Sequence, residues 1–123
     1  MFTIDLLKKS VTKPKVTGKL PTPRETFVFS KISNSKNDIA ILFGGFQEGG
    51  DINDMHILNL KLLKWEHINP IGEIPTPRHG MAFENVGKFL FINGGCNYRA
   101  KKCYTETYFL KIKEFAWYKI ENT

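Results

Sequence analysis

The chain repeats one unit about every 52 residues, and this repeat limits its possible folds more than any other feature. Landmarks that return in register predict a row of similar supersecondary units that stack on one another. Three landmarks recur in the same order, at shifts of 54, 50 and 52 residues: the sequence PTPR (21–24 and 75–78), a glycine pair (Gly44, Gly45 and Gly94, Gly95) and a tryptophan (Trp65 and Trp117).

The opening segment belongs to the same pattern. Residues 1–24 align with residues 55–78 without a gap, and both stretches end in PTPR. We therefore expect residues 1–20 to be the C-terminal half of a preceding unit, with its third and fourth strands. Residues 21–74 and 75–123 are then two successive repeats.

Each unit is predicted to hold four short antiparallel strands, because alternating or continuous apolar runs are separated by turn residues. Gly80 and Ala82 in a first strand suit a crowded position. The second strand should end at its glycine pair, and loops are expected at 30–38, 46–53 and 96–104. The expected strands are 25–29 and 79–84, then 39–43 and 89–92, then 58–60 and 110–112, then 64–68 and 116–120.

No segment of useful length has a helical period, which disfavours alternating strand and helix architectures. The unit resembles the kelch repeats of the galactose oxidase/kelch superfamily. The likeness lies in the four antiparallel strands at this spacing, the double glycine after an apolar strand, the tryptophan in the fourth strand and the PTPR sequence that leads into the unit. The resemblance spans nearly the whole chain. It implies an all-β fold, a partial kelch-type β-propeller of about two and a half four-stranded antiparallel blades.

This sequence departs from the usual kelch pattern at two places. A tyrosine shortly after the glycine pair is typical, as is a second histidine or serine beyond the Pro-Arg. Here Met81 follows His79-Gly80, and Glu25-Thr26 occupies the matching position of the first copy.

The repeated residues have clear structural roles. Gly44, Gly45, Gly94 and Gly95 let the backbone leave a buried strand in a conformation that a Cβ atom disfavours. The prolines stiffen the connection between units, and Trp65 and Trp117 are expected to pack between neighbouring blades.

A closed propeller has four to eight blades, more than this chain supplies. We therefore expect a fragment of a longer propeller, a truncated gene product, or a chain that assembles with other blades or chains.

Charge and cysteine content narrow the class. The formal net charge is +6, with one basic cluster within residues 1–24 and another at Arg99, Lys101 and Lys102. No nucleic-acid fold signature accompanies these clusters, so a basic nucleic-acid-binding surface is kept only as an alternative.

Cys96 and Cys103 are predicted to be reduced thiols, with a disulfide clip or a metal site as alternatives. The chain has no apolar run of membrane length and no secretory signal, which predicts an intracellular, cytoplasmic protein without a membrane partner.

The superfamily that this chain resembles also includes copper radical oxidases of the galactose-oxidase type. Their site needs histidine and tyrosine ligands and a cysteine cross-linked to a tyrosine. Cys103 and Tyr104 are adjacent, so in a strand they point to opposite faces. His56, His67 and His79 lack metal-ligand spacing. We expect no catalytic residue, metal or cofactor, and keep a propeller-enzyme fragment as an alternative.

The remaining prediction is a non-catalytic protein–protein interaction module of an adaptor or scaffold. In kelch propellers, loops between second and third strands and between blades cluster into binding surfaces. The basic residues of these loops suit an acidic or phosphorylated peptide. Arg24 and Arg78 are alternatively held by partners inside their own blade, which we favour for these two. The candidate partner-binding residues are Tyr98, Arg99, Lys101, Lys102, Arg24 and Arg78.

Overall fold

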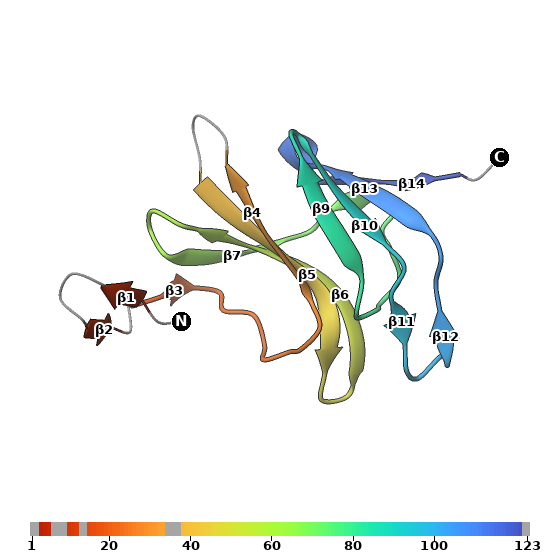
Figure 1. Ribbon diagram of the computed structural model, residues 1–123, viewed down its shortest axis with the longest axis horizontal. Coiled ribbons are helices and arrows are strands. Elements are labelled where there is room, and N and C mark those ends of the chain that lie inside the picture. Colours follow the sequence, from red (N-terminus) through yellow and green to blue (C-terminus); the bar gives the residue numbers. More distant parts are fainter. Residues whose placement is uncertain (1–2, 6–9, 13–14, 34–37, 122–123) are drawn as a thin grey trace.

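The computed structural model describes residues 3–5, 10–12, 15–33 and 38–121 of the chain. Within these ranges there is no α-helix, and the regular structure is β apart from one 3-10 turn, η1 (Ile112–Glu114). Two five-stranded sheets lie side by side (Figure 1). The prediction of an all-β fold built as a partial kelch-type propeller is confirmed.

The first sheet, here called the first blade, has the strand order β3-β7-β6-β5-β4. Strands β4 to β7 form an antiparallel meander, whereas β3 joins the outer edge parallel to β7. Its strands are β3 (Thr17–Gly18), β4 (Val28–Ser33), β5 (Asp38–Gln47), β6 (Gly50–Asn59) and β7 (Lys64–Ile68).

The second sheet, the second blade, repeats this plan in the order β8-β14-β13-β10-β9, with β8 parallel to β14. Two further antiparallel pairs lie outside the blades: β1 (Thr3–Asp5) with β2 (Ser10–Thr12), and β11 (Cys96–Asn97) with β12 (Lys102–Cys103). The strands of the second blade are β8 (Ile71–Gly72), β9 (Ala82–Val86), β10 (Phe89–Asn93), β13 (Thr107–Lys111) and β14 (Ala116–Ile120).

The fifth strand of each blade was not predicted, because four strands per unit were expected. It comes from residues that precede the PTPR of the same blade, and it lies against the tryptophan-bearing strand. A Cβ atom on Gly18 would lie 2.2 Å from the carbonyl oxygen of Trp65, and one on Gly72 would lie 2.3 Å from that of Trp117. Both glycines also have positive φ, so a glycine is needed at this contact.

The predicted first strands were placed too early. Strand β4 begins at Val28 and continues to Ser33, into the region expected to be a loop, and β9 begins at Ala82. Glu25 and His79 instead form single antiparallel bridges to Phe46 and Cys96. The crowding expected at Gly80 and Ala82 was also wrong, because a Cβ on Gly80 would have open space and Ala82 is exposed.

The glycine pairs behave differently in the two blades. Strand β5 does not end at Gly44-Gly45 but passes through them with a bulge and pairs with β6 as far as Gln47. The loop predicted at 46–53 is therefore the end of a β-hairpin. In the second blade, Gly94-Gly95 follows the end of β10 at Asn93, as predicted.

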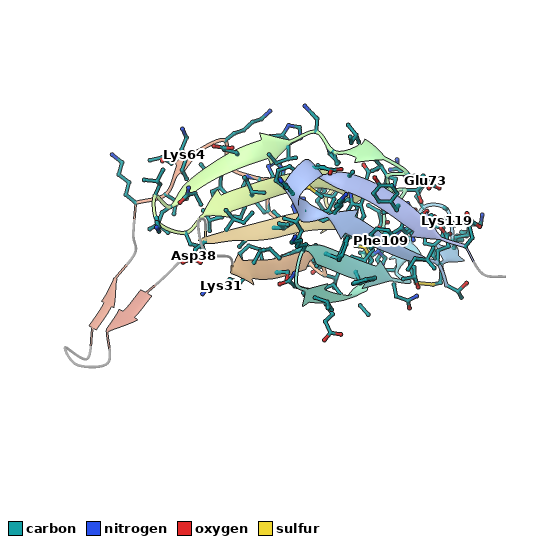
Figure 2. The ribbon with its side chains drawn as sticks, turned by 90° about the horizontal axis from the view of Figure 1, so that it is seen from above. Lys31, Asp38, Lys64, Glu73, Phe109 and Lys119 are labelled. Carbon is teal, nitrogen blue, oxygen red and sulfur yellow. A yellow bond between two sulfur atoms is a disulfide. The ribbon has the colours of Figure 1, made fainter. Side chains whose placement is uncertain are left out.

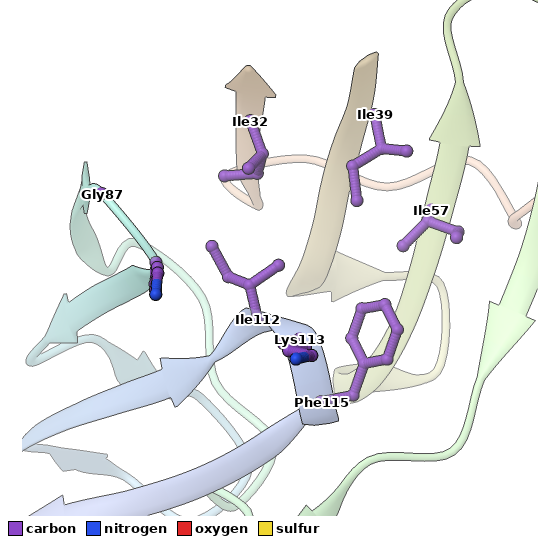
Figure 3. Close-up of a pocket in the computed structure, with 8 residues that line it drawn as sticks. Ile32, Ile39, Ile57, Gly87, Ile112, Lys113 and Phe115 are labelled. Atoms are coloured by element: carbon purple, nitrogen blue, oxygen red, sulfur yellow. The ribbon is translucent and has the colours of Figure 1, made fainter. Parts of the chain in front are cut away.

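The apolar core lies between the two blades. Trp117 is fully buried there, and its ring centroid is 4.9 Å from that of Phe43. Figure 2 shows the first blade, with Lys31 and Lys64, on one side and the second blade, with Phe109 and Lys119, on the other. At one end the core opens into an apolar pocket of about 480 Å³, where Ile32 and Ile57 face Phe115 (Figure 3).

Trp65 differs from Trp117 although the two occupy matching positions. The strand register places Trp65 on the face of the first blade opposite to Phe43. Its side chain is only half-buried, with Phe29 as its aromatic neighbour at 6.4 Å between ring centroids. The expectation that the tryptophans pack between blades is confirmed for Trp117, whereas Trp65 lies on the face of the first blade that points away from the second.

Substitution of Gly72 tests the close contact of the fifth strand. Gly87→Ala, at φ +57° with no atom near the new Cβ, should lower the free energy of unfolding by about 1–2 kcal/mol through left-handed strain alone. Gly72→Ala adds a clash with the Trp117 backbone and should cost about 1–3 kcal/mol more. Urea unfolding followed by tryptophan fluorescence measures both, and equal losses would contradict the contact.

Candidate functional site

The candidate site lies at the end of the blades where the PTPR segments, the β5–β6 hairpin and the β11–β12 hairpin meet (Figure 1). Two buried arginines form its base. The Arg24 side chain is 2% exposed; it donates to both carboxylate oxygens of Asp54 and to the Thr22 carbonyl at 3.1 Å. A buried guanidinium requires such partners, because a desolvated charge without them is strongly destabilising.

Arg78 occupies the same position in the second blade, with a side chain that is 1% exposed. It donates to the carbonyl and hydroxyl oxygens of Thr76 at 3.0 Å, and to the Gly94 carbonyl at 3.4 Å. Its guanidinium also lies 3.9 Å from the centroid of the Tyr104 ring, in cation–π geometry. The structure thus gives Arg24 and Arg78 intramolecular partners within their own blades, as the favoured alternative expected.

Asp54 contacts both Arg24 and His56, and the three side chains form a network that was not predicted from the sequence. The His56 Nε2 atom lies 2.7 Å from Asp54 Oδ2, and His56 is almost fully buried. Burial acts to raise the pKa of Asp54, but hydrogen bonds from Arg24 and His56 outweigh it and hold the pKa below its ordinary value. The network is an ionised carboxylate between a cation and an imidazole.

A second buried carboxylate, Asp51, joins the two blades. Asp51 accepts a hydrogen bond from the His79 Nδ1 atom and another, at 2.9 Å, from the backbone N–H of Tyr98. The Tyr98 ring lies 4.1 Å from the His79 ring and 5.1 Å from the Phe46 ring, measured between centroids. These contacts fix the base of the β11–β12 hairpin on the β5–β6 hairpin of the first blade.

Cys96 and Cys103 form a disulfide, so the prediction of reduced thiols was wrong. They are direct cross-strand partners of β11 and β12, a placement that the sequence spacing alone did not reveal. The pairing of β11 with β12 covers two residues on each strand and is too short to be stable by itself. The disulfide joins the two strands covalently and closes the loop between them. Because Cys103 is bonded to Cys96, it is not available for a cross-link to Tyr104.

The outer part of the hairpin carries the candidate binding residues. Tyr98 is 63% exposed despite its contact with His79, and Arg99, Lys101 and Lys102 are exposed. We call these four residues the basic hairpin. Between the basic hairpin and the β5–β6 turn lies a hollow of about 310 Å³, whose lining includes Gly49, Gly50, Asp51 and Arg99.

The histidines do not converge on a metal. In the described ranges, no group of three or more histidine, cysteine and acidic side chains is placed to hold a metal ion. The rings of His56 and His67 are neighbours at 5.0 Å between centroids, but His79 belongs to the separate Asp51 network.

Of the basic cluster within residues 1–24, Arg24 takes part in this site. Lys8, Lys9 and Lys13 lie outside the described residues, and Lys15 and Lys19 are exposed. No helix in the described part of the chain is long and apolar enough to cross a membrane.

Comparison with known proteins gives the family. A family model described as the KLHDC2/KLHL20/DRC7 Kelch-repeats domain matches residues 1–123. Three proteins with related segments are the Rho GTPase-activating protein gacHH of Dictyostelium discoideum (29% identical, covering 89% of this chain and 7% of that protein), the Rab9 effector protein with kelch motifs of Bos taurus (36%, covering 68% and 23%) and the acyl-CoA-binding domain-containing protein 5 of Arabidopsis thaliana (28%, covering 95% and 17%). The chain thus spans less than a quarter of each relative.

The Asp54 network predicts a loss of stability in mild acid. Burial lowers the pKa of His56 despite the opposing effect of Asp54, and its Nδ1 atom has no hydrogen-bond partner in the described structure. His56 therefore binds a proton more readily in the unfolded chain than in the folded one. As a result, the free energy of unfolding should fall as the pH drops through the ordinary histidine pKa of about 6.5.

His56→Gln keeps a donor for Asp54 but removes the titration. Its free energy of unfolding should fall less between pH 8 and pH 5 than that of the unaltered chain. His67→Gln, which replaces the neighbouring ring, is the matched control and should keep the slope. Urea titrations at each pH measure the slopes, and an unchanged slope for His56→Gln would sink this prediction.

Proposed function

Because this chain belongs to the kelch-repeat domain family, we propose that it is a non-catalytic protein–protein interaction module, part of a larger propeller, adaptor or scaffold. We keep residues 1–20, 21–74 and 75–123 as its repeat units in this proposal. The relatives support a role in protein assemblies, since one is named as a Rab9 effector and one as a Rho GTPase-activating protein.

The basic hairpin is the surface that we propose for the partner. Its exposed cations stand beside an exposed aromatic ring, and aromatic and arginine side chains are the ones enriched at binding hot spots. Its base is fixed by the disulfide and by the Asp51 contacts, which lowers the conformational entropy lost on binding. The Arg24 and Arg78 side chains are buried and donate to acceptors within the chain, so they do not present donors to a partner.

The single observation that carries the proposal is the difference between the buried and the exposed cations of the site. Arg24 and Arg78 are satisfied by intramolecular acceptors, whereas Arg99, Lys101 and Lys102 project into solvent from a clipped hairpin. Exposed cations on a fixed scaffold favour an acidic or phosphorylated peptide segment, for which the arginine fork gives paired hydrogen bonds.

Charge reversal tests this surface. The variant Arg99→Glu, Lys101→Glu, Lys102→Glu should bind a fluorescent glutamate-rich peptide, or its phosphoserine counterpart, at least about tenfold more weakly, a loss of about 1.4 kcal/mol. The matched control is Lys61→Glu, Lys88→Glu, Lys113→Glu, which reverses the same number of exposed charges at the opposite end of the blades. That control should bind within about twofold of the unaltered chain.

Fluorescence anisotropy gives the dissociation constants, and circular dichroism checks that both variants are folded. Equal weakening in the two variants would assign the binding to net charge and not to the basic hairpin. A double-stranded DNA oligonucleotide is the comparison ligand. Binding to DNA that is tighter than to either peptide, with a steep salt dependence, would favour a nucleic-acid surface instead.

A further inference from the structure

The β11–β12 hairpin extends beyond the end of the second blade, and its two arms are held to the protein in different ways (Figure 1). We call residues 96–98 the first arm and residues 99–103 the second arm. The arms are joined by the turn between β11 and β12 and by the Cys96–Cys103 disulfide. All three cations of the basic hairpin lie on the second arm.

Every residue of the first arm is bonded to a neighbouring part of the structure. Cys96 exchanges two backbone hydrogen bonds with His79, each 2.9 Å long. The Asn97 side chain donates to a carbonyl of the second PTPR segment at 2.9 Å, and the Tyr98 N–H donates to Asp51. These contacts use backbone and amide groups and no sulfur atom. The first arm therefore keeps its position whether or not the disulfide is intact.

The second arm depends on the hairpin itself. In the described ranges, each hydrogen bond of residues 99–103 has its other end within the hairpin. The Ala100 N–H donates to the Asn97 side chain, and the Lys101 N–H donates to the Tyr98 carbonyl. Strand β12 pairs with β11 over two residues, which is too short a pairing to be stable alone. The disulfide is therefore the contact that keeps the second arm beside the first.

The backbone of Lys101 gives the second arm a reason to move once it is released. Its φ is +53°, in the left-handed region, which is unfavourable for a residue with a Cβ atom. The closed hairpin imposes this conformation on the turn. Without the disulfide the turn is free to leave it, and Arg99, Lys101 and Lys102 then lose their fixed positions.

The disulfide is accessible to a thiol. Cys103 is exposed and Cys96 is half-buried. The cations of the second arm lie on either side of the turn beside this disulfide, and their positive field attracts the thiolate that attacks a disulfide. Exposed disulfides are the labile kind, whereas buried structural ones resist reduction.

We propose that the Cys96–Cys103 disulfide is a reversible thiol–disulfide modification site that switches the basic hairpin between a fixed and a released state, with a dithiol as the reductant. One thiolate of the dithiol attacks Cys103 Sγ, the Sγ–Sγ bond breaks, and Cys96 leaves as a thiolate that takes up a proton. The second thiolate then attacks the reductant sulfur of the mixed disulfide, and Cys103 leaves as a thiolate and is protonated. Two electrons pass to the protein, and the dithiol becomes a cyclic disulfide.

This switch rests on the function proposed above for the basic hairpin. A fixed second arm presents its cations to the acidic or phosphorylated segment without further ordering, whereas a released arm must be ordered when the segment binds. The oxidised chain is therefore the form with high affinity. Reduction weakens binding although every charged side chain of the surface is still present.

Limited tryptic cleavage tests the release of the second arm without any ligand. Trypsin cuts after Arg99, Lys101 and Lys102, and mass spectrometry of quenched and fully reduced samples gives the rate at each bond. Treatment with dithiothreitol should raise these rates at least about fivefold, because cleavage follows the population of the open segment. The bonds after Lys61 and Lys88, in turns at the opposite end of the blades, are the internal control. Their rates should stay within about twofold.

The variant Cys96→Ser, Cys103→Ser is the matched control for the reductant. These are the two cysteines of the chain, so dithiothreitol has no other cysteine pair in it to act on. The variant should be cut at the fast rate with or without dithiothreitol. Unchanged cleavage of the second arm on reduction would overturn the proposal. So would an equal rise at the control bonds, which means general unfolding, or thiols that stay free in a buffer of oxidised glutathione.

Peptide binding then tests the switch. Fluorescence anisotropy with the glutamate-rich or phosphoserine peptide should give a dissociation constant at least about fivefold higher for the reduced chain and for the serine variant than for the oxidised chain, a difference of about 1 kcal/mol. Reoxidation with oxidised glutathione should restore the original value.

The two proposals fail in different ways. If the oxidised chain binds a peptide and reduction leaves the dissociation constant unchanged, the switch is wrong and the proposed function stands. If the oxidised chain binds neither peptide, the proposed function is wrong and the switch of binding fails with it. The cleavage rates still show in that case whether the disulfide holds the second arm.

Discussion

The burial of Trp117 against Phe43 between the two blades is the interaction on which the rest of the structure depends. Neither sheet encloses a core by itself, because each is a single layer with apolar residues on both faces. Stacking removes one face of each blade from water, and the apolar core of the described structure therefore belongs to both blades together.

Polar groups at one end of the stack hold the blades in register. Asp54 pairs with Arg24 and His56 inside the first blade, whereas Asp51 connects to His79 and to the Tyr98 backbone in the second. Buried carboxylates are tolerated only with such partners. The result is a rigid base below the basic hairpin, so the cations that reach solvent do so from a fixed position.

The proposed binding surface and the apolar core use different parts of the molecule. The basic hairpin lies at one end of the blades, whereas the core lies between the two sheets. A change in the exposed residues of the basic hairpin therefore leaves the contact between the blades in place. This separation suits a kelch domain, in which loops vary on a constant framework.

The sequence by itself determined the all-β repeat, the second and fourth strands, and the places where Trp65 and Trp117 fall, because strand patterns and turn residues act locally. Only the tertiary structure decided that Trp117 packs against Phe43, because this contact joins strands of different blades. It also decided the fifth strand, the Asp51 and Asp54 networks and the Cys96–Cys103 disulfide. These features join residues that are far apart in sequence or are brought together by a hairpin, and a local pattern carries no information about the distance between them.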